Sequence, residues 1–164
     1  MSPKRSRRID YWQASDAPEP TSRKPSASVL VQDDQGRVLL LRRTDNDLWT
    51  IPTGGLKKNE TIRECGVREC REETGLDIEI TGLVGVFTTP DHVIVYTHGD
   101  KIDEVRQPVN ICLHARPIGG RMTPTDEASQ VRWVPPSELA VYDIHPALRR
   151  RIDHGLSSTA PHVD

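Results

Sequence analysis

Three glutamates in the short segment RECREE are the residues of this chain most able to do chemistry. Glu69, Glu72 and Glu73 stand at relative positions i, i+3 and i+4, so on a helix they share one face within an arc of about 100°. The apolar or small residues in or beside the same arc are Ile62, Cys65, Gly66 and Cys70. The opposite side is mainly charged. We therefore predict that the three carboxylates face the body of the protein.

This placement separates two interpretations of the acidic segment. A Glu-rich helix commonly carries its acids as a solvated stripe opposite the apolar residues, whereas here the acids share the apolar side. Clustered like charges are unfavourable unless a cation offsets them. Oxygen ligands select magnesium or manganese over zinc. The pattern therefore favours a divalent-metal site over a solvated stripe.

The elements around these glutamates have to position them. We predict a helix over 61–74 that ends at Gly75, a residue suited to the left-handed C-terminal cap. Before it, Gly54 and Gly55 allow backbone groups to approach a ligand closely. Glu60 lies at the helix start, where the helix dipole favours a carboxylate, and Arg68 can pair with acids on or near the helix. Each of these features alone is also explained by ordinary capping or a surface ion pair.

The rest of the chain supplies the strands. Apolar and β-branched runs bounded by turn residues predict a hairpin over 26–43, with RVLLLRR as its second strand. Further strands are expected at 77–88, 92–98, 109–117 and 130–135, and a final helix begins at Pro146. Residues 97–108 are interpreted as a polar loop, either a plain connection or a gate over the site. Mixed strands and helices indicate an α/β or α+β fold around a mixed sheet.

Composition excludes several classes of protein. At 164 residues with a formal net charge of -2, the chain is long enough for one domain and has no basic field of the kind that nucleic-acid binders use. It has no apolar run of membrane-spanning length and no N-terminal export segment. Cys65, Cys70 and Cys112 lack metal-ligand spacing and are expected to be small buried hydrophobes. We expect a cytoplasmic protein with no nucleic-acid or membrane partner.

The termini are expected to differ from the domain at 26–155. Residues 1–25 are rich in Pro, Ser and charge and are expected to form a flexible or docking segment. Its basic cluster, Lys4, Arg5, Arg7 and Arg8, is interpreted as a solvated, frayed terminus. The aromatic pair Tyr11 and Trp12 is expected to dock on its own domain or on a second subunit, which leaves a homodimer open. The tail at 156–164 is expected to be loose.

The residues around the acidic segment together resemble the Nudix box. The family pattern is a Gly, five residues, a Glu, seven residues, then Arg-Glu, an apolar residue, one more, Glu-Glu, one more, Gly and an apolar residue. The matching positions here are Gly54, Glu60, Arg68, Glu69, Cys70, Glu72, Glu73, Gly75 and Leu76. Trp49, Pro52 and the closing segment from Glu127 to Val134 agree as well. The resemblance covers about 26–155.

This resemblance implies an α/β/α sandwich, with the box forming a loop and helix against a mixed β-sheet. It implies that Glu69, Glu72 and Glu73 bind divalent cations, Mg²⁺ or alternatively Mn²⁺. It also implies that the carbonyl of Thr53 adds a ligand and that Glu127 completes the set or acts as the base. The base is Glu72, Glu73 or Glu127. Glu60 and Arg68 belong to the same motif and look structural, fixing the loop on the helix. The basic run at 57–59 departs from the acidic and glycine residues of many relatives.

The implied activity is hydrolysis of a diphosphate bond in a nucleoside diphosphate linked to another moiety, as in nucleotides, nucleotide sugars or ADP-ribose. Metal ions neutralise the dense charge of such a substrate, and a carboxylate orients or deprotonates the attacking water. The alternative is a ligand sensor that keeps the fold without turnover. The intact box favours the hydrolase.

Several residues outside the box are candidates for substrate binding. Arg42 and Arg43 end the hairpin and could reach phosphate. Strand alternation puts His92 and Tyr96 on one face, where Tyr96 could stack on a base. Arg106 lies in the polar loop, and Gly54 and Gly55 complete the set. For each of the side chains a packed or surface role is equally compatible, so the substrate stays open.

Overall fold

The computed structural model describes residues 6–164 of the chain. Its elements in chain order are β1 (Ser6–Trp12), β2 (Pro25–Val31), β3 (Val38–Arg43), β4 (Trp49–Thr50), β5 (Thr53–Gly55), α1 (Ile62–Thr74), β6 (Leu76–Phe87), β7 (His92–His98), β8 (Lys101–Arg106), β9 (Val109–Gly120), β10 (Ala128–Val134), the 3-10 helix η1 (Pro136–Val141), α2 (Pro146–Ser157) and β11 (His162–Val163). Among these residues no helix is both long enough and apolar enough to span a bilayer.

A five-stranded mixed sheet forms the centre of the molecule, in the order β11-β6-β9-β2-β5. β2 runs parallel to β9 and β11 parallel to β6, whereas the β6-β9 and β2-β5 pairs are antiparallel. The last five residues of β2 are all buried. A strand covered on both faces needs a continuous apolar run, which explains why this segment of the sequence does not alternate.

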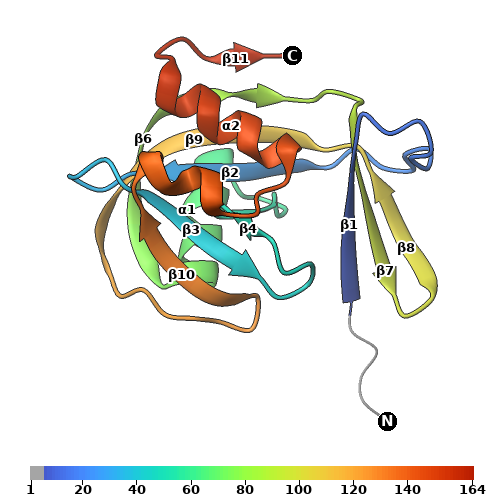
Figure 1. Ribbon diagram of the computed structural model, residues 1–164, viewed down its shortest axis with the longest axis horizontal. Coiled ribbons are helices and arrows are strands. Elements are labelled where there is room, and N and C mark those ends of the chain that lie inside the picture. Colours follow the sequence, from blue (N-terminus) through green and yellow to red (C-terminus); the bar gives the residue numbers. More distant parts are fainter. Residues whose placement is uncertain (1–5) are drawn as a thin grey trace.

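The two α-helices cover opposite faces of this sheet (Figure 1). On one face, Cys70 of α1 packs in a cluster with Val29 of β2 and Leu113 of β9. On the other face, Leu148 and Ile152 of α2 pack with Leu30 and Cys112. The alternation of Val29 and Leu30 between the two clusters follows from the period of two along a strand. The predicted α/β/α sandwich is confirmed, and all three cysteines are buried free thiols as expected.

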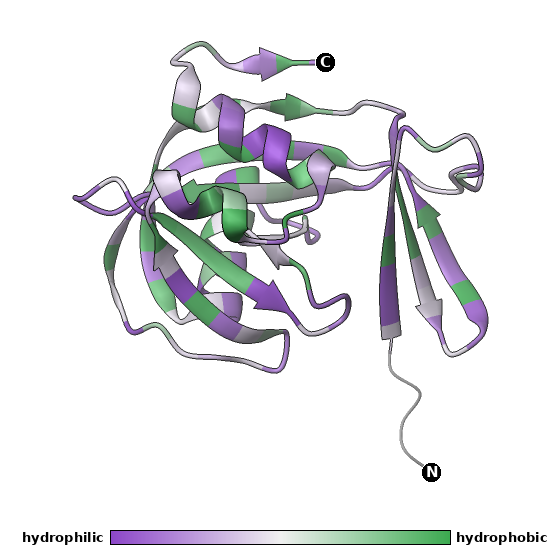
Figure 2. Ribbon diagram, in the orientation of Figure 1, coloured by the Kyte–Doolittle hydropathy of each residue, from purple (hydrophilic) through white to green (hydrophobic). Residues whose placement is uncertain are grey.

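Two smaller sheets flank the central one. β10, β3 and β4 form one of them and β1, β7 and β8 the other, which stands beside the main body at the right of Figure 1. β3 is hydrophobic over most of its length and hydrophilic at its end (Figure 2), because its first four residues are buried and the two arginines that follow are half-exposed. The hairpin predicted over 26–43 is wrong as a strand pair, because β2 and β3 belong to different sheets and, among the residues that the structure describes, are bridged only between Gln32 and Val38.

The N-terminal segment is ordered from residue 6 onward, which corrects the expectation of a frayed terminus there. β1 pairs antiparallel with β7, from Ser6 opposite His98 to Trp12 opposite His92. The Arg8 side chain is only 8% exposed in this strand, and the carboxylate of Asp10 accepts two hydrogen bonds from its guanidinium, both 2.8 Å long. The segment thus docks on its own domain. Lys4 and Arg5 of the basic cluster lie outside the described residues.

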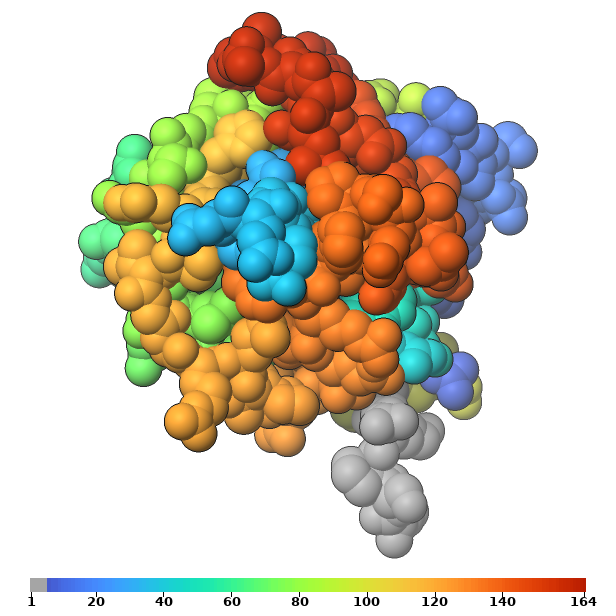
Figure 3. Space-filling model, turned by 60° about the vertical axis from the view of Figure 1, so that its left-hand side comes forward, coloured from blue at the N-terminus to red at the C-terminus, as the bar shows by residue number. Residues whose placement is uncertain are grey.

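Two further expectations are corrected. The C-terminal tail is not loose, because β11 pairs with β6 and the Asp164 carboxylate accepts hydrogen bonds from the backbone amides of Thr88 and Thr89. Figure 3 shows η1, α2 and this tail as one continuous layer over the surface. The polar loop expected at 97–108 contains the strand β8, whose charged residues are tolerated because Glu104 pairs with Arg106 and Lys24.

Candidate active site

Helix α1 begins and ends close to the predicted residues. The Thr61 hydroxyl accepts a hydrogen bond from the Glu64 amide, and the Glu64 carboxylate accepts one from the Thr61 amide. This reciprocal capping box fixes the start of the helix. Gly75 ends it in the left-handed conformation with φ of 80°, which glycine adopts without a steric penalty. The helix is therefore held firmly at both ends of the segment that carries the glutamates.

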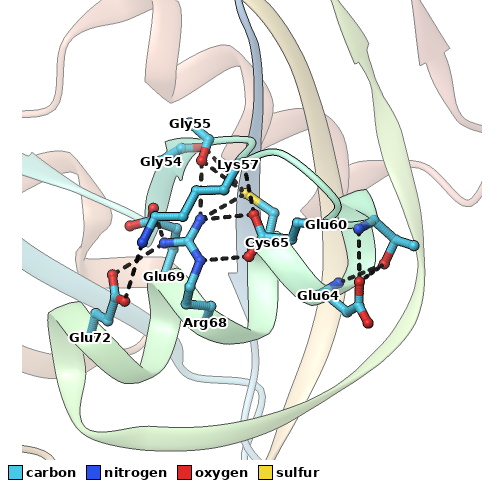
Figure 4. A network of polar contacts seen from close by, with 10 residues as sticks. Gly54, Gly55, Lys57, Glu60, Glu64, Cys65, Arg68, Glu69 and Glu72 are labelled. Carbon is cyan, nitrogen blue, oxygen red and sulfur yellow. Dashed lines mark hydrogen bonds and ion pairs between the residues drawn. The ribbon is translucent and has the colours of Figure 1, made fainter.

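Arg68 fastens the loop before the helix to the helix itself (Figure 4). Its guanidinium donates to both carboxylate oxygens of Glu60, at 2.5 and 3.0 Å, and to the backbone carbonyl of Gly55 at 3.1 Å. It also donates to Glu69 at 2.6 Å and to Glu72 at 3.2 Å. These contacts fit the structural role that the resemblance implied for Glu60 and Arg68. They also orient Glu69.

Three carboxylates converge beside this network. Glu69, Glu73 and Glu127 each offer an oxygen, and these oxygens lie within 4.8 Å of one another. Glu73 is only 2% exposed, and one of its oxygens accepts a hydrogen bond of 2.9 Å from the Thr53 amide. Glu72 lies apart from this group: its half-exposed side chain faces Arg68 and Lys57. The structure thus brings together part of the predicted set of metal ligands.

The electrostatics of this cluster suit a hard divalent cation. Burial raises the pKa of Glu69, and burial likewise raises the pKa of Glu73 to about 8. Desolvation and the neighbouring acids outweigh the opposing effects of Arg68 on Glu69 and of Arg43 on Glu73. An all-oxygen donor set of this kind matches the preference of Mg²⁺ and Mn²⁺. The residues present therefore fit the metal that the resemblance implies.

The cluster lies in a cavity of about 340 Å³ between α1, the β1-β7-β8 sheet and α2. The predicted site residues that line it are Arg43, Thr53, Gly54, Gly55, Arg68, Glu69, Glu72, Glu73, Tyr96, Arg106 and Glu127. The Tyr96 ring lies between two guanidinium groups, with the Arg106 carbon 4.8 Å and the Arg8 carbon 6.0 Å from its centroid. Carboxylates and cations thus share one cavity.

Three predicted residues lie outside the cavity lining. Arg42 points away and donates to the Asp47 carboxylate at 2.6 Å, so the strand alternation separates it from Arg43. His92 is buried under β1, where its Nε2 is hydrogen-bonded to Asp10 at 2.8 Å. It therefore does not line the cavity that contains the carboxylate cluster. Glu60 accepts hydrogen bonds from Arg68 and from the Lys57 amide in the loop before α1.

Three cationic residues of the cavity were absent from the predicted site set: Lys57 of the basic run at 57–59, Arg8 and Arg151. Arg8 comes from the segment interpreted as frayed, and Arg151 from the final helix, where only the apolar positions were considered. The pattern that could have identified Arg8 is the acid two positions later, Asp10, which lies on the same face of a strand. The helical period distinguishes Arg151 from Arg149 and Arg150, because it shares an arc with the buried apolar residues Ala147, Leu148 and Ile152.

A second group of potential ligand atoms, from Asp10, His92 and His145, lies behind the cavity. Both oxygens of Asp10 already accept hydrogen bonds from the Arg8 guanidinium, and one of them also contacts His92. The Nδ1 of His145 caps α2 by accepting from the Ala147 amide. This network is satisfied internally and joins β1, β7 and the start of α2.

Comparison with known proteins agrees with this geometry. A family model described as NUDIX domain matches residues 22–154. A MutT-like protein from Streptomyces ambofaciens is 31% identical over 84% of this chain and 79% of its own length. Nucleoside triphosphatase NudI from Salmonella agona is 30% identical over 75% and 89%. A NUDIX hydrolase structure from Nitrosomonas europaea aligns with a TM-score of 0.68 at 21% identity, covering 88% of this chain and 77% of that one. The chain therefore belongs to the NUDIX family of hydrolases.

Proposed function

We propose that this chain is a magnesium-dependent pyrophosphohydrolase that cleaves the diphosphate bond of a nucleoside diphosphate linked to another moiety. The observation that carries the proposal is the convergence of Glu69, Glu73 and Glu127 in a cavity whose lining also includes five arginines, one lysine and one aromatic ring. Acids that hold a divalent cation and cations that hold phosphate oxygens are the two halves of a diphosphate site. The triphosphatase name of one relative is in line with this substrate class.

The roles of the chain's own residues follow from their positions. Glu69 and Glu73 would hold the cation, with the Thr53 amide fixing Glu73. A divalent cation held there supplies charge neutralisation as negative charge develops on the diphosphate. Glu127, which is exposed at the cavity mouth, would accept the proton of the attacking water. Arg43 and Tyr96 line the cavity and would contact phosphate and base.

The experiment is hydrolysis of nucleoside triphosphates, ADP-ribose, nucleotide sugars and dinucleoside polyphosphates with Mg²⁺. It compares wild type with the Glu72→Gln, Glu73→Gln and Glu127→Gln variants. A matched control is Glu79→Gln, because Glu79 is half-exposed on β6 and pairs with Arg116 outside the cavity. We expect loss of a base or ligand to lower kcat by about 10²–10⁴-fold, with the control unchanged. Full activity in all three cavity variants would contradict the mechanism. Ligand binding without turnover of any compound would favour the sensor instead.

The remaining features of the proposal concern the protein's surroundings. We propose that it acts in the cytoplasm on small molecules, supported by three free buried cysteines and a net charge of -2. No nucleic-acid or membrane partner is expected. A homodimer stays a prediction, and sedimentation velocity at micromolar concentration would test it.

A further inference from the structure

Arg151 is the most unusual charged residue of the cavity. It lies on α2, is only 4% exposed, and lines the cavity that contains the carboxylate cluster. Within residues 6–164 its Nε has no hydrogen-bond partner, and none of the ion pairs found there includes it. Its neighbour Arg150, by contrast, donates to the Asp164 carboxylate at 2.8 Å.

The other arginines of the cavity are all neutralised. Their acidic partners are Asp10 for Arg8, Asp45 for Arg43, Glu60 and Glu69 for Arg68, and Glu104 for Arg106. Arg151 has the Phe87 ring instead, whose centroid lies 5.8 Å from its guanidinium carbon. An aromatic face attracts a cation only weakly compared with a carboxylate. Among the described residues, its charge is therefore left without an acid.

A buried charge without a partner is strongly unfavourable. Burial lowers the pKa of Arg151 to about 10, so the guanidinium still carries its charge at neutral pH. A fold that keeps such a group beside a cavity is in its most stable form when an anion fills the place of the missing acid. The opening that an anion would use is the cavity itself, since Arg151 lines it.

The elements that carry Arg151 and the carboxylates argue that this anion and the diphosphate are different groups. Glu69 and Glu73 project from α1, whereas Arg151 projects from α2, and the two helices cover opposite faces of the central sheet (Figure 1). The cavity is lined from both helices and from the strand β5 at the sheet edge. A substrate that extends from one helix to the other would place different groups at the two ends.

We propose that Arg151 binds a second anionic group of the substrate, a phosphate or a carboxylate, on the moiety remote from the cleaved bond. The preferred substrates are then nucleoside diphosphate compounds that carry one such group beyond the diphosphate. The inference rests on the proposed hydrolase function, because it treats the bound molecule as a substrate. The binding of an anion by Arg151 can nevertheless be measured without turnover.

The first test measures binding in the absence of metal. Thermal unfolding in EDTA is followed against inorganic phosphate for wild type, Arg151→Met and Arg116→Met, the last being a matched loss of an exposed arginine on β9. We expect Arg151→Met without phosphate to be at least as stable as wild type, because it removes an uncompensated buried charge. We expect phosphate to raise the thermal midpoint of wild type and of Arg116→Met. Arg151→Met should need at least a tenfold higher phosphate concentration for the same rise in midpoint. A less stable Arg151→Met with an unchanged response, or no response in wild type, would overturn the proposal.

The second test measures selectivity with matched substrate pairs. UDP-glucuronate and UDP-glucose differ by one carboxylate, and NADPH and NADH differ by one phosphate, so the pairs separate the two sources of charge. We expect wild type to prefer the charged member of at least one pair by about 10- to 100-fold in kcat/KM, the range of a charged hydrogen bond. Arg151→Met should abolish the preference and Arg151→Lys should keep part of it. Equal kcat/KM within both pairs would overturn the proposed selectivity. Hydrolysis of none of the four would overturn the proposed selectivity for these compounds. The proposed function would then be decided by the wider substrate panel, and the binding of an anion by Arg151 by the phosphate titration.

Discussion

Gly54 offers the sharpest test of how the loop and helix form one site. A Cβ atom built on Gly54 would lie 2.0 Å from the carboxyl carbon of Glu69 and 2.2 and 2.4 Å from its two oxygens. Ordinary contact begins at 3.4 Å, so in Gly54→Ala the carboxylate has to move by about 1.4 Å. The side chain of Glu69 is flexible, and the fold therefore accommodates this change at little cost.

The consequences for stability and for activity are expected to differ. A glycine-to-alanine change in unstrained backbone alters the free energy of unfolding by only about 1 kcal/mol. A displacement of more than 1 Å at a catalytic group lowers activity by about 10²-fold. We therefore expect Gly54→Ala to lose about 100-fold in kcat/KM and to require more Mg²⁺, while its thermal midpoint stays within a few degrees of wild type.

The neighbouring glycine supplies the control. A Cβ at Gly55 would meet no atom within 4 Å, and its carbonyl keeps its hydrogen bond to Arg68 in the variant. Steady-state kinetics at several Mg²⁺ concentrations and thermal unfolding should be measured for both variants. Equal activity of Gly54→Ala and Gly55→Ala, at either a high or a low level, would refute the steric argument and with it the importance of the Glu69 position.

Three further predictions concern the elements that support the site. Arg68→Met should lower the thermal midpoint and kcat together, because the variant loses the hydrogen bonds to Glu60 and to the carbonyl of Gly55. An unchanged midpoint would contradict the role of Arg68 in holding the loop on the helix. Arg8→Met should raise KM more than it lowers kcat, because Arg8 lines the cavity away from the carboxylate cluster; steady-state kinetics on the preferred substrate separate the two. Burial lowers the pKa of His92 from 6.5 to about 4. Above pH 6.5 the imidazole is neutral in both the folded and the unfolded chain, so the stability of the fold is complete there with respect to this group. About 3 kcal/mol of that stability is lost as the pH falls through the interval to 4, and unfolding measured over this range should be much less pH-dependent in His92→Gln.

The parts of the fold that follow from the sequence are those that depend on near neighbours. The start and end of α1 were predictable because its cap residues lie within three positions of the helix. The inward face of Glu69 and Glu73 followed from the helical period, because both carboxylates share an arc with Cys70. Glu72 was assigned with them on the same spacing, yet it faces solvent, Arg68 and Lys57. Spacing defines an arc, and the side chains packed around it decide which part of that arc is buried.

The parts that could not be predicted depend on pairing between distant segments. Arg8 is buried because β1 pairs with β7, a contact across more than eighty positions. The polar run at β8 becomes a strand only because β7 offers an edge and Glu104 receives Lys24 and Arg106. No local sequence pattern predicts the burial of Arg8 or the formation of β8, since a charged strand and a charged loop have the same composition.

Reaction chemistry and substrate choice are therefore encoded in different parts of this chain. Helix α1 places Glu69 and Glu73 within one short stretch, held by Arg68 and by the caps, and only Glu127 of the cluster comes from a distant loop. Arg43 comes from β3, whereas the other substrate-facing residues, Arg8, Tyr96, Arg106 and Arg151, come from β1, β7, β8 and α2, four elements that meet only in the folded protein. β1 also lies outside the residues that the family model matches. Changes in these four elements can alter which substrate fits while the carboxylate cluster stays intact. Selectivity should accordingly respond to Arg8, Tyr96, Arg106 and Arg151, and the Mg²⁺ requirement should not.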